Sequence, residues 1–311
     1  MLDLGLLRDL LTRHGADWDA PVPGFTLRGR PFDFARRRYL MGVINLSPDS
    51  WYRESVCTSE GEAIARGRLL AAQGADLVDI GAESTLPHAA RVAPAEQAAR
   101  LVPVVRALAA EGVLVSAESY HPEVLEAAGE AGAAVFNLTG TRDEDAAYAL
   151  ARRFDAAVVH CYVQGETVRA ADAFTFSADM TAALADYFRE RLARARAAGV
   201  TRHIVDPGLG FYYRNLEDGA LRVAHQLRTF LHAFRHRPLG CPLLNILPHA
   251  PEVFGEAHRR AAEPFFAVLA LLGGSHILRT HELDAVARIR TVLEAYRDDT
   301  PAGGASPDAA E

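Results

Sequence analysis

The 311-residue chain contains no lysine, because all 33 of its basic residues are arginines. Without lysine, a chain cannot form a lysine Schiff base with a carbonyl substrate or with pyridoxal phosphate. It also cannot supply the lysine that grips phosphate in a P-loop. The absence therefore excludes Schiff-base aldolases, pyridoxal-phosphate enzymes and P-loop NTPases.

Cysteines and long apolar runs are also scarce. Cys57, Cys161 and Cys241 are widely spaced and form no CxxC pair, which is typical of free thiols in a reducing compartment. No run of about 18 apolar residues predicts a membrane span. The first 15 residues carry Asp3 and Asp9 inside an apolar pattern, unlike a secretion signal. We therefore expect a cytoplasmic protein with no membrane partner.

An excess of basic charge is missing too. The 33 arginines face 40 acidic residues, which gives a formal charge of −7. A general nucleic-acid binder needs basic side chains against phosphates, so we expect no nucleic-acid partner. The hydrophobic share of 50% and charged share of 23% are ordinary for a globular protein.

Short β-rich runs and helical patterns alternate eight times between residues 39 and 298. Eight such pairs over about 260 residues predict an α/β fold of the (β/α)8 or TIM-barrel class. An open doubly wound sheet is the alternative, but no G-x-G-x-x-G follows the first strand. The predicted strands are 39–45, 77–80, 113–117, 134–137, 156–160, 203–206, 242–246 and 276–280. The predicted helices are 60–73, 94–110, 122–131, 143–153, 178–198, 216–235, 256–272 and 283–297.

The predicted barrel spans residues 39–298. Outside it, the chain consists of an N-terminal extension and a C-terminal tail. Residues 1–38 predict a short amphipathic helix over 2–11 and a β-hairpin with strands 25–27 and 32–34, joined through Arg28-Gly29-Arg30-Pro31. We expect the helix to pack on the barrel, and a partner-binding or dimer helix is the alternative. Residues 299–311 are rich in Pro, Gly, Ala and acid, which predicts disorder.

In a barrel of this class, reacting groups lie at the C-terminal ends of the strands. Polar residues end nearly every predicted strand here, and we expect them to converge on one pocket. They are Asn45, Asp79, Glu83, Glu118, Asn137, His160, Asp206, Asn245, Arg279 and His281.

Four segments carry a family resemblance: GVINLSPDS (42–50), DIGAEST (79–85), DPGLGF (206–211) and LRTH (278–281). They resemble the dihydropteroate synthase family, the pterin-binding barrels of folate biosynthesis. The resemblance runs from residue 25 to residue 296, in order and with family-like spacing.

The resemblance implies a transferase. The family binds a 6-hydroxymethyl-dihydropterin diphosphate with Mg²⁺ on its diphosphate. An arylamine, p-aminobenzoate, then displaces the diphosphate at the methylene carbon, without a covalent enzyme intermediate. The resemblance also implies a homodimer formed through the last helices.

The family's binding residues fall on defined positions of this chain. The resemblance places Glu118, Asn137 and Asp206 on the amino-pyrimidinone edge of the pterin. A carboxylate suits that edge because it accepts from an amino group and a ring N–H side by side. The resemblance places Thr85, Arg279 and His281 at the diphosphate and Asn45 at the Mg²⁺.

Each position has a plainer interpretation. Asp206 alone would cap the turn at Pro207-Gly208, and Arg279 would pair with Glu282 or Asp284 on the surface. Glu118 and Asn137 would make hydrogen bonds at the barrel mouth, and Asn45 would hold its own loop. We interpret His160 as a structural histidine, and Asp79 and Glu83 as residues that order the mouth.

The sequence departs from the family where the phosphate and the second substrate bind. The family's Ser-Thr-Arg-Pro reads Ser84-Thr85-Leu86-Pro87, and its first loop is rewritten as residues 51–55, WYRES. The Ser-Arg-Lys of strand seven becomes Leu247-Pro248-His249, in which His249 is a possible replacement donor for the lysine. The identity of the amine therefore cannot be predicted from these residues.

Three functions follow as hypotheses. The first is a dihydropteroate synthase-like transferase, favoured by Asp206, Asn137 and Arg279-x-His281. The second keeps the pterin pocket but changes the reaction, for example to methyl transfer from a methyltetrahydrofolate. The third is a pterin-binding regulatory paralogue without catalysis. Turnover with any amine separates the first from the third.

Overall fold

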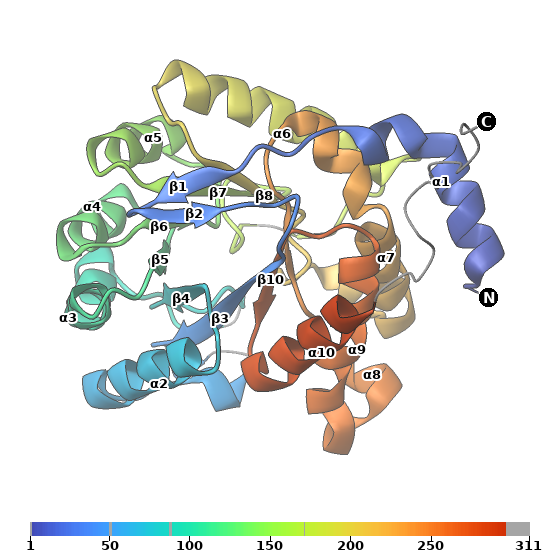
Figure 1. Cartoon of the computed structure of the whole chain (residues 1–311). Helices are drawn as coiled ribbons and strands as arrows, with labels where there is room; N and C mark the ends of the chain where they lie inside the picture. Colours follow the sequence, from blue (N-terminus) through green and yellow to red (C-terminus); the bar gives the residue numbers. More distant parts are fainter. Residues whose placement is uncertain (1, 50–51, 87–88, 171, 297–311) are drawn as a thin grey trace, which may run out of the picture.

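The computed structural model describes residues 2–49, 52–86, 89–170 and 172–296, and it confirms the predicted barrel (Figure 1). Eight parallel strands pair in the order β8-β7-β6-β5-β4-β3-β10-β9. An isolated bridge between Val205 and Leu243 joins the two end strands. The strands are β3 (Tyr39–Asn45), β4 (Leu77–Gly81), β5 (Val115–Glu118), β6 (Val135–Leu138), β7 (Ala157–Cys161), β8 (His203–Asp206), β9 (Leu244–Ile246) and β10 (Ile277–Thr280).

Helices surround the strands, and two predicted helices are broken. The prediction of a single helix over 216–235 is wrong, because the structure has two 3₁₀ turns and one α-helix there. Asp218 has an extended backbone, and its side chain accepts from the N–H groups of Ala220 and Leu221 to cap the α-helix. In the predicted helix 256–272, a regular α-helix begins only at Ala262, which places Pro264 in the first turn, where proline is tolerated. The helices are α2 (Glu60–Ala72), α3 (Pro94–Ala110), α4 (Pro122–Ala131), α5 (Glu144–Arg153), α6 (Met180–Ala197), α7 (Gly219–Leu231), α8 (Pro251–Phe254), α9 (Ala262–Leu272) and α10 (Leu283–Ala295), with 3₁₀ turns η1 (Arg53–Ser55), η2 (Arg214–Glu217), η3 (Ala233–Leu239) and η4 (Glu256–Ala261).

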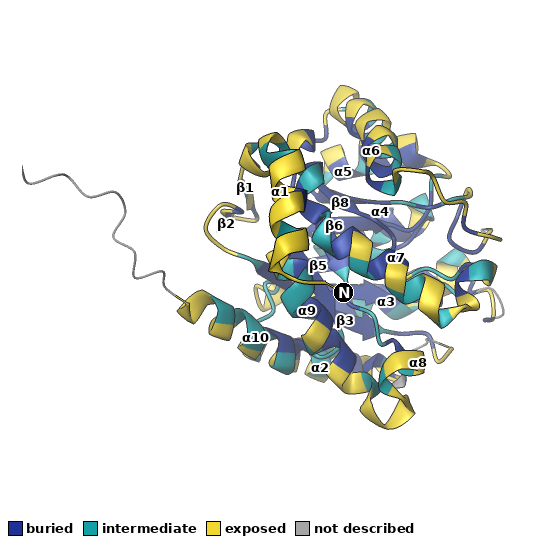
Figure 2. Cartoon of the chain, turned by 90° about the vertical axis from the view of Figure 1, so that its right-hand side faces the viewer, coloured by how far each residue is buried: buried dark blue, intermediate teal, exposed yellow. Residues whose placement is uncertain are grey.

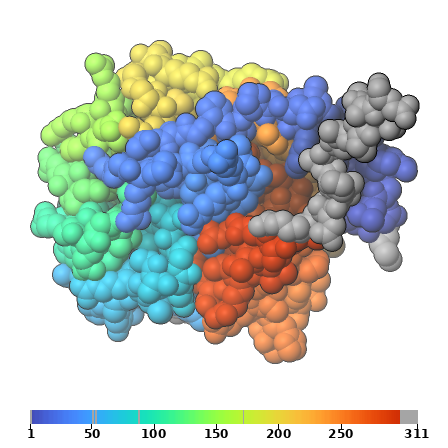
Figure 3. Space-filling model, in the orientation of Figure 1, coloured from blue at the N-terminus to red at the C-terminus, as the bar shows by residue number. Residues whose placement is uncertain are grey.

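The N-terminal hairpin covers the end of the barrel where the strands begin (Figures 1 and 3). It consists of β1 (Phe25–Leu27) and β2 (Arg30–Phe32). Arg28 and Gly29 both have positive φ, 47° and 80°, as a two-residue primed turn requires. The turn is therefore shorter than predicted, and Arg30 and Pro31 belong to the second strand.

The N-terminal helix α1 (Leu4–Asp19) is longer than predicted and is interrupted at His14, whose backbone leaves helical geometry. Its last turn packs on η3: the Trp18 and Phe234 rings meet edge to face, 5.7 Å apart. Arg237 Nε donates to the Ala20 carbonyl at 2.9 Å. The rest of α1 is largely exposed (Figure 2). Among the described helices, none is long and apolar enough to cross a membrane.

Alternation along the strands creates two separate cores. Side chains of one parity, such as Met41, Val135 and Val159, pack inside the barrel with the hairpin residues. Side chains of the other parity, such as Leu40 and Phe136, pack outward against the helices. Because the period of a strand is two, a polar residue at a strand end faces the pocket only when its parity is inward.

Gly273 allows α7 and α9 to lie close together. A Cβ at Gly273 would lie 1.9 Å from the carbonyl oxygen of Phe230, whereas a Cβ at Gly61 in α2 would meet nothing within 4 Å. We predict that Gly273→Ala lowers the free energy of unfolding by about 2 kcal/mol, the usual cost of overpacking. Gly61→Ala should instead raise it by about 0.5–1 kcal/mol. Urea unfolding of both variants checks this, and equal effects would contradict it.

Candidate active site

A cavity of about 540 Å³ opens at the C-terminal ends of the strands. Its base is formed by inward-facing polar residues of five strands, and its walls come from the loops that follow β3, β4, β8, β9 and β10. The base residues are Glu118, Asn137, Cys161, Asp206 and Arg279, and the wall includes Asn45, Tyr52, Thr85, His249 and His281.

Three of the ten polar strand-end residues do not line this cavity, so the expectation that all of them converge is wrong. Asp79 is fully buried against Arg279, and His160 and Asn245 face outward. His160 Nε2 lies 3.3 Å from His203 Nδ1, outside the barrel. Asn245 donates to Ser275 Oγ at 2.8 Å. Both residues have the outward parity of their strands, which the position at a strand end does not reveal. The structural interpretation of His160 agrees with this placement.

Arg279 forms the centre of the base. Its Nε donates to Asp79 Oδ2 at 2.8 Å, and its Nη2 donates to Glu118 Oε2 at 2.6 Å. Asn137 Nδ2 donates to the same Asp79 oxygen at 3.1 Å. The alternative of a surface pair with Glu282 or Asp284 is therefore wrong. The guanidinium instead holds two carboxylates, and with them Asn137, in one connected network.

Burial and crowded negative charge shift the carboxylates of the base. Desolvation raises the pKa of Glu118 to about 7, against the attraction of Arg279, and nearby Asp79 and Asp206 raise it further. Desolvation also raises the pKa of Asp206 to about 6. The carboxylates of Asp79, Glu118 and Asp206 lie near a single cation, Arg279. The base therefore has more hydrogen-bond acceptors than donors, which favours a ligand that donates hydrogen bonds.

Asp206 caps the turn, as the plainer interpretation has it, and it also lines the cavity. One carboxylate oxygen, Oδ1, accepts from the Gly208 N–H at 2.8 Å, which is the turn cap. The other oxygen, Oδ2, lies 3.8 Å from Cys161 Sγ, and this thiol also lies 3.2 Å from Asn137 Oδ1. Cys161 thus lies between two of the three residues predicted to hold the pterin, Asn137 and Asp206. Burial, followed by the charge of Asp206, raises the pKa of the thiol well above its usual range, so it stays neutral.

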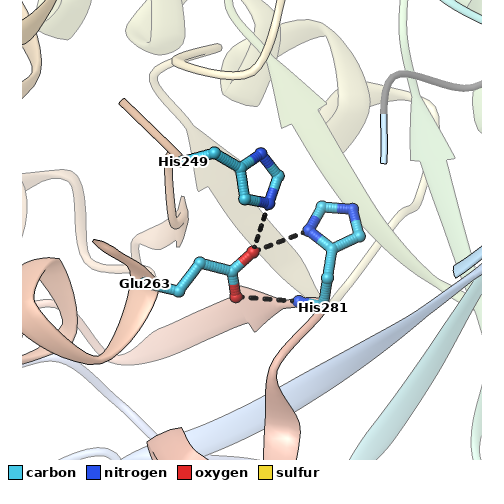
Figure 4. A group of neighbouring side chains, drawn as sticks. All are labelled: His249, Glu263 and His281. Carbon is cyan, nitrogen blue, oxygen red and sulfur yellow. Dashed lines mark hydrogen bonds and ion pairs between the residues drawn. The ribbon is translucent and has the colours of Figure 1, made fainter. Parts of the chain in front are cut away.

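Two histidines of the cavity wall, His249 and His281, meet the fully buried Glu263 of α9 (Figure 4). His249 Nε2 and His281 Nδ1 lie 2.9 Å and 2.8 Å from the same oxygen, Oε1, of Glu263. Burial opposes ionisation of Glu263, but His281 and His249 outweigh it and lower the pKa of this carboxyl. An ionised carboxylate accepts hydrogen bonds, so each imidazole nitrogen that faces it acts as donor.

Tyr52 and the asparagine of the first strand complete the wall. The Tyr52 ring stacks on His249 with centroids 4.3 Å apart and planes at 7°. Asn45 Nδ2 donates to Ser55 Oγ at 2.6 Å, so Asn45 does hold its own loop, as the plainer interpretation has it. The amide nitrogen of Asn45 is used for this bond. Residues 50, 51 and 87 of the rewritten loops lie outside the described residues.

The loop after β4 is ordered by residues that do not reach the cavity base. Glu83 accepts from Tyr120 Oη at 2.6 Å and from the Val92 N–H at 3.1 Å, which agrees with the ordering role we expected. Buried Arg169 donates to the carbonyls of Ser84 and Ala89. This places an arginine beside the loop in which Leu86 replaces the family arginine.

Sequence reasoning missed Tyr52, Cys161, Arg169 and Glu263. Glu263 alone carried a signal, because it is the only charged residue in the apolar helix AEPFFAVLALL and is fully buried. A charge in such a helix needs a partner, and long-range packing supplies it.

Known proteins match this chain over most of its length. Residues 41–281 fit the family model described as pterin binding enzyme. Dihydropteroate synthase of Escherichia coli strain K12 is 30% identical over 260 residues, which are 83% of this chain and 91% of that protein. The structure of Xanthomonas albilineans dihydropteroate synthase with 4-aminobenzoic acid is similar at a TM-score of 0.74 and 30% identity, over 88% of this chain and 98% of that one. The Thermus thermophilus enzyme in complex with 4-aminobenzoate gives a TM-score of 0.72 and 30% identity, over 88% and 100%.

The barrel and its pocket of inward carboxylates therefore place the protein among TIM-barrel enzymes that hold a ligand at the strand ends. The chain belongs to the pterin-binding enzyme family, as a dihydropteroate synthase-like transferase. The resemblance seen in the four sequence segments is confirmed.

The raised pKa of Glu118 gives a test of the base. The folded protein binds more protons than the unfolded chain between pH 4.5, the ordinary pKa, and about 7. Its stability must therefore fall as pH rises through this window. We predict that wild type loses unfolding free energy relative to Glu118→Gln from pH 4.5 to about 7. Urea unfolding across this range measures the difference, and parallel pH profiles would rule out the raised pKa.

Proposed function

We propose that this protein condenses a 6-hydroxymethyl-dihydropterin diphosphate with an arylamine and releases diphosphate. The observation that carries the proposal is the base of the cavity, in which buried Asp206 and Asn137 and partly buried Glu118 face one cavity. The 7,8-dihydropteroate complex of the Xanthomonas albilineans enzyme, similar at a TM-score of 0.71, agrees with it.

The base matches the hydrogen-bonding edge of a pterin. A pterin offers an amino group and a ring N–H as donors, and an ionised Asp206 accepts both. Asn137 is fixed by its bond to Asp79 Oδ2, so its amide oxygen is the acceptor that it presents near Cys161. Ligands without these donors would leave buried polar groups unpaired, which gives the site its selectivity.

The diphosphate would lie toward the wall of the cavity. Thr85 and His281 line that wall, and Asn45 presents its amide oxygen there. Mg²⁺ prefers oxygen ligands and usually keeps substrate phosphates among them. Asn45 alone is one oxygen ligand, so this chain fits an Mg²⁺ that arrives on the substrate diphosphate. Arg279 would act on the diphosphate only from the base, because two carboxylates already hold its guanidinium.

The direct test is turnover by the purified full-length chain with Mg²⁺, the pterin diphosphate and p-aminobenzoate. We expect dihydropteroate and diphosphate in equal amounts. Pterin binding without turnover on any amine would replace this proposal with a non-catalytic binder. Methyl transfer from a methyltetrahydrofolate to a corrinoid acceptor would replace it with the second hypothesis. The predicted homodimer and cytoplasmic location remain predictions, and sedimentation tests the former.

Asp206 provides a binding prediction that does not depend on turnover. Hydrogen bonds to a charged group contribute about 1.5–3 kcal/mol, so Asp206→Asn should weaken binding of a reduced pterin by about 10- to 100-fold. Calorimetric titration measures this affinity. Asp172→Asn is the control, because Asp172 forms an exposed ion pair with Arg214 and neither residue lines the cavity. Unchanged affinity in Asp206→Asn would contradict the hypothesis that the pterin binds at this base.

A further inference from the structure

Three residues at the wall of the cavity bring metal-ligand atoms together, and two of them, His249 and Glu263, have no part in the proposed reaction. One ligand atom each from His249, Glu263 and His281 lies within 4.8 Å of the other two (Figure 4). We infer that these three residues bind one transition-metal ion of the Zn²⁺ class, separate from the Mg²⁺ carried by the substrate.

The donor set selects this class of metal. Two imidazoles and one carboxylate are a common ligand set for catalytic Zn²⁺ and for non-haem Fe²⁺. Mg²⁺ and Ca²⁺ take oxygen ligands and do not compete well for imidazole nitrogen. Three protein ligands leave a coordination position open. His249 and His281 line the cavity, and Glu263 is fully buried beside them.

The geometry is close to what such an ion requires. A tetrahedral site with bonds of about 2.0–2.1 Å separates its ligand atoms by about 3.3 Å. The separations of Glu263 Oε1 from His249 Nε2 and from His281 Nδ1, 2.9 Å and 2.8 Å, are slightly shorter than this. The ion would replace the protons in these two hydrogen bonds, with the imidazoles moving toward each other and the carboxylate oxygen moving outward.

The surroundings hold the ligands in place. The second oxygen of Glu263, Oε2, accepts from the Thr280 hydroxyl and from the N–H groups of His281 at 2.9 Å and Glu282 at 3.1 Å. Tyr52 stacks on His249 and fixes the plane of its ring. Outer contacts of this kind orient metal ligands and tune their affinity. Glu263 is fully buried, so the three ligands lie in a site of low dielectric.

The ion would also change the net charge of the wall from negative to positive. His249 stands where the family lysine is expected, and a buried carboxylate lies beside it. A departing diphosphate would meet this negative charge, whereas a bound divalent cation would reverse its sign and stabilise the leaving group. This consequence rests on the proposed function. Binding of the ion does not, because it is measured without substrates.

The test uses the full-length chain after chelator treatment, titrated with Zn²⁺ by calorimetry and with Co²⁺ by visible absorption. We expect one ion per chain, with the intense d–d bands of four-coordinate Co²⁺, and no competition from millimolar Mg²⁺. His249→Gln and Glu263→Gln should each weaken binding at least tenfold. The matched control His258→Gln changes an exposed histidine on η4 and should bind as wild type does.

Absence of stoichiometric binding in wild type would overturn the inference, as would His249→Gln binding as tightly as wild type. Circular dichroism and reduced-pterin binding establish that each variant is folded. If Glu263→Gln fails to fold, His249→Gln and His281→Asn decide the question. Wild type that binds a reduced pterin but no metal would reject the metal site and leave the proposed function standing. Wild type that binds the metal but no reduced pterin would reject the proposed function and leave the metal site standing.

Discussion

The base of the cavity depends on the buried ion pairs of Arg279. A guanidinium is charged at any physiological pH, and its planar fork binds two carboxylates at once. In this barrel it joins Asp79 from β4 to Glu118 from β5, and Asp79 in turn fixes Asn137. Removing one partner of a buried pair leaves an uncompensated charge, which is strongly destabilising. The site and the closed barrel are thus stabilised by the same contacts.

The barrel and its base follow largely from local sequence. Eight strand–helix alternations set the architecture, and strand ends located Glu118, Asn137 and Asp206. The face of the strand on which each side chain lies was not predicted. The position at a strand end does not distinguish His160, which faces outward, from Cys161, which faces inward on the same strand. A one-residue change in register reverses the face of a side chain. Periodicity within β7 would have separated the two.

The wall was less predictable, because its partners lie far apart in the chain. Glu263 meets His249 and His281 across two loops, and Tyr52 reaches His249 from nearly 200 positions away. The sequence showed only that a lysine had become a histidine. The structure adds the carboxylate of Glu263 beside this histidine, which no pattern near His249 in the sequence indicates.

The division of each strand into an inward and an outward set separates two kinds of evolutionary change. Substitutions at outward positions are constrained by the fit of helices to the sheet, and they leave the ligand's surroundings almost untouched. Inward side chains near the strand ends point away from the helices, and they are constrained by the ligand instead. The residues of the cavity can therefore change while the scaffold that holds them is retained, as it is here at 30% identity to Escherichia coli dihydropteroate synthase.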